Sequence, residues 1–427
     1  MLGRVDLSKD LILRWDHPEP THVDLLKKAR VAAVVCAAGN QAFSDACSSA
    51  GIQTIQASEL QFVGLDKLGN TESDTGVVLT TGLWPGIRRP PTVKGRGDET
   101  ASASREPWVD SNGYLAGYLR ALYPKRPAVL GYLPEGLDDR VVPFDSLELA
   151  LVESWTAGGN YLLAVEPNYR QALLSGDPKA ASAWENLGRT AHWLREHIGL
   201  FRQPAIPIVT ALVEPGAATA EIANLLYRRN VSPFLAPASD PPAPDARATL
   251  AVVAANLRPP SPEIAVRILA HAEAGGAVVT AGLPSRAWWQ RPELKPVRSE
   301  PDRAFYSFGK GQVIAYKRPV VDPSEFALDV IDIITHKQRA VRLWNAPSVI
   351  ALATASPRKG ERLLPLINYG APIDTELQAR VQGHFSKAQL LRPDAPPLTL
   401  PVVKRGSTTE VFVPELKRAG VVVFGGG

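Results

Sequence analysis

Residues 128–165 contain the pattern that decides the fold: AVLGYL (128–133), SLELALVESWTA (146–157) and YLLAV (161–165). The two short apolar runs have the length and composition of buried strands, and the run between them is long enough for a helix. Strand, helix and strand in this order indicate a βαβ unit, in which parallel strands are covered by the helix that connects them. The segment therefore predicts an α/β fold around a parallel sheet.

The same alternation extends toward the N-terminus. Apolar runs typical of strands lie at residues 11–15, 31–37, 52–56 and 76–81, with helical patterns at 22–29, 41–50 and 114–122. This gives six strands, and residues 106–112 are a candidate seventh. A full (β/α)8 barrel usually needs about 250 residues. A long amphipathic pattern at 178–197 ends the region, so residues 1–203 are predicted to form a compact or incomplete TIM-like barrel.

Two further patterns follow along the chain. Residues 204–338 alternate strands near 208–212, 234, 250–254 and 277–281 with helices at 219–229 and 262–274, which predicts a flavodoxin-like, doubly wound α/β domain. From residue 339 to 427, short strands recur at intervals of about ten residues and turn residues separate them. That spacing predicts a C-terminal antiparallel β-sandwich.

The overall composition excludes several classes of protein. The chain has 427 residues, a net charge of only +4, 45% hydrophobic residues and 21% charged residues, all ordinary for a globular protein. Its basic residues are not clustered, so we expect no nucleic-acid partner. Its longest apolar run, at 31–38, is far shorter than the roughly twenty residues of a membrane span, so we expect no membrane partner. A cytoplasmic location is expected, or a periplasmic or secreted one if a leader is missing from the chain.

Common cofactor and nucleophile motifs do not occur in the sequence. Cys36 and Cys47 have no Cys or His at metal-ligand spacing, so neither a metal site nor a disulfide is expected. P-loop, dinucleotide-binding, zinc-protease and nucleophile-elbow motifs are also missing. We therefore expect chemistry without a cofactor.

Three stretches of the second half carry a family resemblance. They are AEIANLLYRRN (220–230); GKGQV (309–313) with PSEFA (323–327); and VRLWNAPS (341–348) with LINY (366–369) and TEVFVP (409–414). Together with the order of the three domains, they resemble the bacterial glycoside hydrolase family 42, the β-galactosidase type. The resemblance implies a carbohydrate substrate or ligand and a middle domain of the trimerisation type. It implies a homo-oligomer, for which the apolar helix face around Leu225 and Leu226 is a candidate.

The chain departs from that family where its chemistry lies. Barrel glycosidases of this kind carry an Asn-Glu pair after the fourth strand, with Glu as the general acid, and this sequence has no Asn-Glu dipeptide. The catalytic residues of the family therefore cannot be transferred. They have to be sought among the acids that follow the predicted strands.

Glycoside hydrolysis normally uses two carboxyl groups, one protonated and one ionised. In a βα-barrel, reacting groups gather at the carboxyl ends of the strands. Glu166, Glu135 and Asp16 follow three predicted strands, and we take them as candidate catalytic residues. Simpler interpretations exist: Asp16 could pair with Arg14 or cap the next helix, and Glu135 could be a solvated loop position. Glu166 is flanked by Pro167 and Asn168 directly after a buried strand.

Side chains near the same strand ends are candidates for sugar binding. Aromatic rings pack against the C–H faces of pyranose rings, and polar groups bond the hydroxyls. The candidates are Trp15, Trp84, Trp108, Tyr132, His17, Asp110 and Asn112. Packing at the barrel rim would explain the aromatic residues equally well, and Asp110 could cap a helix.

Two functions follow from these patterns. The first is a glycoside hydrolase acting on a glycoside or oligosaccharide through carboxyl groups at the strand ends. The alternative is a non-catalytic carbohydrate-binding or scaffold protein built on a degenerate glycosidase barrel.

Overall fold

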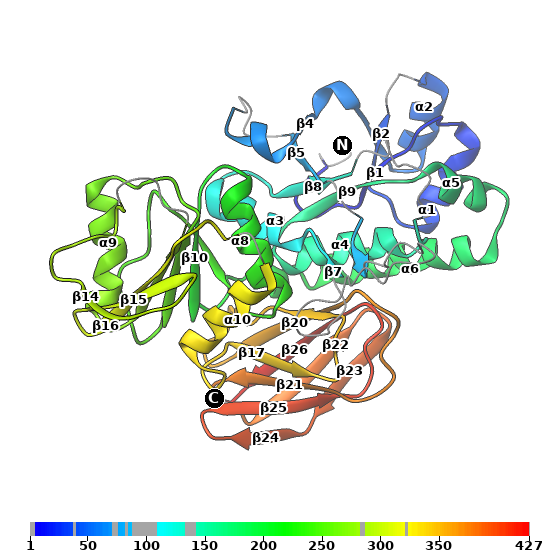
Figure 1. Cartoon of the computed structure of the whole chain (residues 1–427). Helices are drawn as coiled ribbons and strands as arrows, with labels where there is room; N and C mark the ends of the chain where they lie inside the picture. The colour runs from blue at the N-terminus through cyan, green and yellow to red at the C-terminus, as the bar shows by residue number, and fades with distance from the viewer. Residues whose placement is uncertain are drawn as a thin grey trace, which may run out of the picture.

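The chain folds into three regions of different architecture, shown from blue to red in Figure 1. The computed structural model describes residues 5–36, 40–70, 76–81, 84–87, 109–132, 142–281, 287–320 and 323–426. Each region is organised around its own sheet or pair of sheets. The domain boundaries at 203/204 and 338/339 stay predictions.

A seven-stranded parallel sheet forms the first region. Its order is β3-β2-β1-β9-β8-β5-β4, so the last strand, β9, lies beside the first. Their bounds are β1 Ile12–Arg14, β2 Ala33–Cys36, β3 Gln53–Gln56, β4 Gln61–Val63, β5 Val77–Thr80, β8 Val129–Gly131 and β9 Asn160–Ala164. This is the cyclic strand order of a TIM barrel. The predicted compact, incomplete barrel and its six strands are confirmed.

The barrel is open between β3 and β4. Only residues 57–60, mostly the short 3-10 helix η2 (Ala57–Glu59), connect these two strands. Parallel neighbours need a crossover of a dozen or more residues, so a link of this length cannot bring β4 alongside β3. The chain instead continues from β3, which pairs with β2, to β4, which pairs with β5.

The predicted seventh strand at 106–112 does not join the barrel. Its described part, β7 (Val109–Asp110), pairs antiparallel with β6 (Gly86–Ile87) in a separate two-stranded ribbon. The sequence prediction is wrong here because a short apolar pair carries no information about which sheet it enters.

The two faces of the barrel sheet differ in what covers them. The inner face gathers one small cluster from six strands: Ile12, Ala33, Val35, Ile55, Val78, Val129 and Leu162. Helices cover the outer face, and most of them lie below and to the right of the barrel in Figure 1. They are α1 (Val23–Lys28), α2 (Gln41–Ser49), α3 (Gly113–Leu122), α4 (Ser146–Thr156), α5 (Pro167–Leu174), α6 (Pro178–Glu196) and α7 (Ile198–Phe201). Short 3-10 helices η1 (Pro20–His22) and η3 (Leu65–Asn70) complete the connections.

The middle region has flavodoxin-like topology. Its parallel strands are β10 (Val209–Val213), β11 (Phe234–Pro237), β12 (Ala251–Ala255), β13 (Ala277–Ala281) and β16 (Gly311–Tyr316), in the order β11-β10-β12-β13-β16. Numbered along the chain, this is the 2-1-3-4-5 order of flavodoxin-like sheets. An antiparallel pair, β14 (Lys295–Ser299) and β15 (Arg303–Phe308), extends the sheet beyond β16.

Three helices pack on this sheet: α8 (Ala217–Arg228), α9 (Pro262–Glu273) and α10 (Pro323–Ile334). Leu225 and Leu226 of α8 are buried within the chain. The expectation that this helix face mediates association is therefore wrong, because its apolar side chains are already used in the core. A homo-oligomer stays a prediction without an assigned surface.

The last region is the predicted sandwich of two antiparallel sheets. One contains β17 (Val341–Trp344), β21 (Leu377–Gln382), β25 (Thr408–Val413) and β24 (Val402–Arg405). The other contains β18 (Val349–Ala351), β19 (Thr354–Ala355), β20 (Arg362–Asn368), β26 (Ala419–Gly425), β22 (Lys387–Arg392) and β23 (Ala395–Leu400). Ile350, Ile367 and Tyr369 join the core on the outer face of the barrel, so the sandwich is packed against the barrel helices.

Candidate functional site

Two predicted carboxylates lie at the carboxyl ends of neighbouring barrel strands. β1 and β9 pair in parallel with Arg14 opposite Ala164, and the ladder continues with a bond from the Val165 amide to the Arg14 carbonyl. Asp16 and Glu166 each lie two residues beyond that last pair. Ile12 and Leu162 point into the barrel, and side chains alternate along a strand, so this spacing keeps Asp16 and Glu166 on the inner side.

Glu166 is a buried carboxyl group at the start of α5. Only 6% of the residue is exposed. Burial raises the pKa of its carboxyl group, and the hydrogen bond from Asn168 Nδ2 to Glu166 Oε1, at 3.2 Å, opposes that rise. Pro167 begins α5 directly after Glu166, and this fixes the backbone where the strand turns into the helix. Its surroundings therefore favour the protonated form of the carboxyl group more than water does.

Asp16 lies in a more polar and more exposed position. Its Oδ1 atom is 3.4 Å from Nε of Arg14, and its side chain is 29% exposed. Arg170 of α5 donates from Nη1 to the Asp16 carbonyl oxygen at 2.7 Å, which ties the two strand exits together. His17 follows in the left-handed backbone region at φ 53° and is exposed to solvent.

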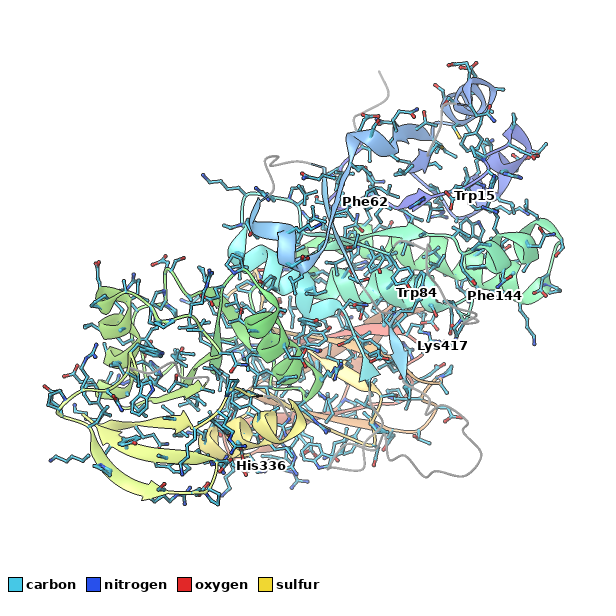
Figure 2. All side chains as sticks on the ribbon, turned by 45° about the horizontal axis from the view of Figure 1, so that its top comes forward. Trp15, Phe62, Trp84, Phe144, His336 and Lys417 are labelled. Carbon is cyan, nitrogen blue, oxygen red and sulfur yellow. The ribbon has the colours of Figure 1, made fainter. Side chains whose placement is uncertain are left out.

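An aromatic pair follows two other barrel strands. The rings of Trp84, after β5, and Tyr132, after β8, have centroids 4.6 Å apart and are tilted by 39°. Both side chains are half-buried. Phe144 stacks on Tyr169 of α5 with centroids 4.7 Å apart. Figure 2 shows Trp84 and Phe144 well separated from Trp15 in this view.

Trp15 is a core residue. It has no exposed surface, donates from Nε1 to His22 Nδ1 at 3.2 Å and packs edge-on against Trp184. It follows Leu13 on the outer face of the sheet, where the helices cover it. Its placement matches the packing interpretation, because a ring without exposed surface has no face to offer a sugar.

Asp110 and Asn112 belong to other elements than the two carboxylates. Asp110 lies in the β6–β7 ribbon opposite Gly86. Asn112 is buried and donates from its backbone amide to Glu153 Oε2 at 3.0 Å and from Nδ2 to Glu153 Oε1 at 3.2 Å. Its polar atoms therefore serve a contact inside the protein. Glu135 and Trp108 lie outside the described residues.

Sequence reasoning named Arg14 only as a partner of Asp16, which the structure confirms, and it missed Glu153. Arg14 interrupts the apolar run of β1 at an inward-facing position, and that interruption was a signal that alternation could have used. Glu153 lies in the middle of α4 with no exposed surface, and nothing in a helical run distinguishes a buried Glu from a solvated one.

Two properties of the described residues concern metal ions and membranes. In the described ranges no group of three or more His, Cys, Asp or Glu side chains is arranged to hold a metal ion. Over the same ranges, no helix combines the length and the apolar character needed to cross a bilayer.

The same architecture occurs in proteins of known structure. The α-L-fucosidase isoenzyme 2 from Paenibacillus thiaminolyticus matches 98% of this chain and 100% of its own, with a TM-score of 0.60 and 8% sequence identity. The chain has a glycoside hydrolase-type fold. The β-galactosidase from Bacillus circulans sp. alkalophilus matches 81% of this chain with a TM-score of 0.50 and 10% identity. This chain spans only 60% of that enzyme.

At these identities the likeness extends to the fold alone. No protein-family model matches the sequence, and no curated protein matches it. The comparisons therefore show the fold of the chain, and its chemistry depends on its own residues.

Proposed function

We propose that this protein hydrolyses glycosides, with Glu166 and Asp16 as its pair of carboxyl groups. The observation that supports this most is their position at the exits of two hydrogen-bonded strands, β9 and β1, on the inner side of a glycosidase-type barrel. Active sites of βα-barrels form at this end of the strands.

The different surroundings of the two groups suggest different roles. Glu166 is buried and its pKa is raised, so it can hold a proton and donate it to the departing glycosidic oxygen. Asp16 lies 3.4 Å from the Arg14 guanidinium and is partly exposed. In the proposed reaction Asp16 is the nucleophile or the base for a water molecule. Two carboxyl groups whose environments differ in this way are the arrangement that glycoside hydrolysis requires.

A carbohydrate ligand also suits the aromatic residues near this edge. The half-buried rings of Trp84 and Tyr132 follow β5 and β8 and pack against the core on the outer face of the sheet, so only part of their surface is open to a ligand. Pyranose rings present C–H faces that pack on such surfaces. We propose that these rings position the sugar, while the barrel carboxyl groups act on its glycosidic bond.

The test is turnover of a panel of aryl glycosides by the full chain and three variants. Glu166→Gln and Asp16→Asn should each lower kcat by roughly 100-fold or more, because each removes a reacting group. Glu185→Gln, which changes an exposed carboxylate on α6, is the matched control and should leave kcat unchanged. Unchanged turnover in both site variants would refute the assignment of these residues.

A second function stays open, because the chain lacks the Asn-Glu pair of the family that it resembles. It is carbohydrate binding without catalysis on a degenerate barrel. If the protein binds oligosaccharides in a calorimeter and cleaves none of the panel, this alternative replaces hydrolysis.

A further inference from the structure

A cavity of about 620 Å³ lies at the amino-terminal edge of the barrel, where all three regions meet. Its lining includes Ser8, Ala128 and Gly158, which precede strands β1, β8 and β9, and residues of α3. Strand β11 closes another side, and Leu352 and Thr354 come from the sandwich. The cavity lies at the end of the sheet where the parallel strands begin. Asp16 and Glu166 lie at the opposite end, where the strands finish. The volume of the cavity is in the range of small-molecule sites.

Two arginines in the lining, Arg120 and Arg202, have no acidic partner among the residues that the structure describes. Arg120 donates from Nη1 to the Ala157 carbonyl at 3.1 Å and from Nη2 to the Arg202 carbonyl at 2.9 Å. Arg202 donates from Nη2 to the carbonyl and hydroxyl oxygens of Ser8, at 2.7 and 3.0 Å. Each guanidinium has five N–H donors, so both keep donors for a further acceptor.

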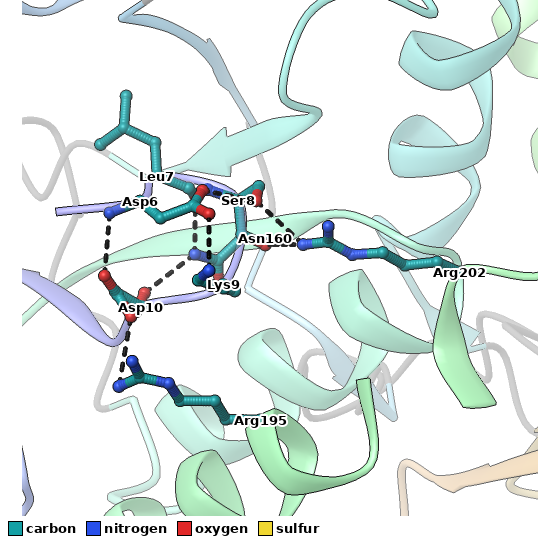
Figure 3. Close-up of polar contacts among 8 residues, drawn as sticks. All are labelled: Asp6, Leu7, Ser8, Lys9, Asp10, Asn160, Arg195 and Arg202. Atoms are coloured by element: carbon teal, nitrogen blue, oxygen red, sulfur yellow. Dashed lines mark hydrogen bonds and ion pairs between the residues drawn. The ribbon is translucent and has the colours of Figure 1, made fainter. Parts of the chain in front are cut away.

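The acidic residues nearby are already engaged. Figure 3 shows Arg202 reaching Ser8, while Asp6 pairs with Lys9 at 3.1 Å and Asp10 with Arg195 at 3.3 Å. Asp240, which also lines the cavity, pairs with Arg267 at 2.9 Å. Among the described residues, the two arginines therefore bring positive charge to the cavity without a carboxylate to balance it.

The cavity also carries an unused hydroxyl group and apolar walls. Thr354 is only 4% exposed, and its Oγ1 atom has no hydrogen-bond partner among the described residues. Tyr114, Phe234 and Leu235 supply apolar surface. Burial lowers the pKa of Arg120, and the charge of Arg202 lowers it further, so an anion between them would relieve an unfavourable arrangement.

We infer that this cavity binds a small organic anion, with a carboxylate or phosphate group held by Arg120 and Arg202. Guanidinium groups bind both oxyanions through paired, charge-assisted hydrogen bonds. The apolar walls receive the body of the ligand. This site is separate from the proposed glycosidase site and does not depend on it.

Calorimetric titration of the full chain tests the inference with four probes. Phenyl phosphate and benzoate carry the two oxyanions on an apolar ring, inorganic phosphate lacks the ring, and benzyl alcohol lacks the charge. We expect phenyl phosphate or benzoate to bind, and the two remaining probes to bind at least about ten-fold more weakly. Equal binding of benzyl alcohol would overturn the role of the arginines, and no binding of either ring anion would overturn the site. Equal binding of inorganic phosphate would overturn the apolar part of the site.

Substitutions in the lining test whether the anion binds in this cavity. Arg120→Gln and the cavity-filling Ala121→Trp should each weaken binding of the ring anion by about ten-fold or more, whereas Arg189→Gln, an exposed charge on α6, should not. If Arg120→Gln fails to fold, Ala121→Trp decides: unchanged affinity in that variant places the anion elsewhere and overturns the inference.

Discussion

Glu153 is the most deeply buried carboxyl group that the structure describes, with no exposed surface in the middle of α4. It accepts hydrogen bonds from the Asn112 amide at the start of α3 and from the Tyr369 hydroxyl of the sandwich, both at 3.0 Å. Burial raises its pKa to about 7, although these hydrogen bonds oppose the rise. A single side chain therefore connects two regions of the molecule and titrates near neutral pH.

This raised pKa makes a prediction about stability. The folded protein holds the Glu153 proton up to about pH 7, whereas an unfolded chain releases it near pH 4.5, so stability is highest below pH 4.5 for this group and falls as pH rises toward 7. Between pH 4.5 and pH 7, ionisation of Glu153 is expected to lower the free energy of unfolding by about 3 kcal/mol. Glu153→Gln cannot ionise, so urea unfolding at pH 5.5 and pH 8 should show a smaller loss than in the unchanged protein. The same loss in both proteins would contradict the raised pKa.

Among single residues, those that come directly after a predicted strand could be located from the sequence. Asp16 and Glu166 could be found because each follows a predicted strand by one or two positions, and alternation then sets the face. Glu153 could not be found, because its partners Asn112 and Tyr369 are distant in the sequence. Trp15 was ambiguous for a related reason: a large aromatic residue at a strand end suits both a core and a ligand.

At the scale of elements, regular apolar runs were predictable and irregular ones were not. The six barrel strands stand out because buried parallel strands are continuously apolar. β4, three residues long, follows β3 too closely to be seen as a separate strand. β14 is exposed along its whole length and has no apolar face to detect.

The contact between α6 and α1 gives a prediction for an element. A Cβ atom on Gly188 of α6 would lie 2.7–2.8 Å from backbone atoms of Ala29, which follows α1, so the helix needs glycine here for a close approach. We expect Gly188→Ala to lower the free energy of unfolding by about 1–3 kcal/mol. Gly199→Ala in α7 is the control: its Cβ would meet nothing within 4 Å, so the change should be neutral or stabilising by up to about 1 kcal/mol. Chemical denaturation of both variants measures the difference, and equal effects would contradict the close packing.

At the scale of the whole molecule, the order barrel, flavodoxin-like layer and sandwich followed from the sequence, because each region has its own periodicity. How the regions pack could not be predicted, since it depends on contacts between distant segments. Ile350 and Ile367 of the sandwich join the barrel core, and the cavity with Arg120 exists only where the three regions meet. The architecture therefore creates two separate edges of the barrel, one that carries Asp16 and Glu166 and one that carries Arg120 and Arg202.

The central claim, that Glu166 protonates the departing group of a glycoside, is tested most directly by varying the leaving group. The measurement is kcat/KM of the unchanged protein and Glu166→Gln on one sugar linked to a poor leaving group, phenol, and to a good one, 2,4-dinitrophenol. A good leaving group needs no proton, so we predict a loss of roughly 100-fold or more on the first substrate and a much smaller loss on the second. Equal losses on both substrates, or no loss on either, would contradict it.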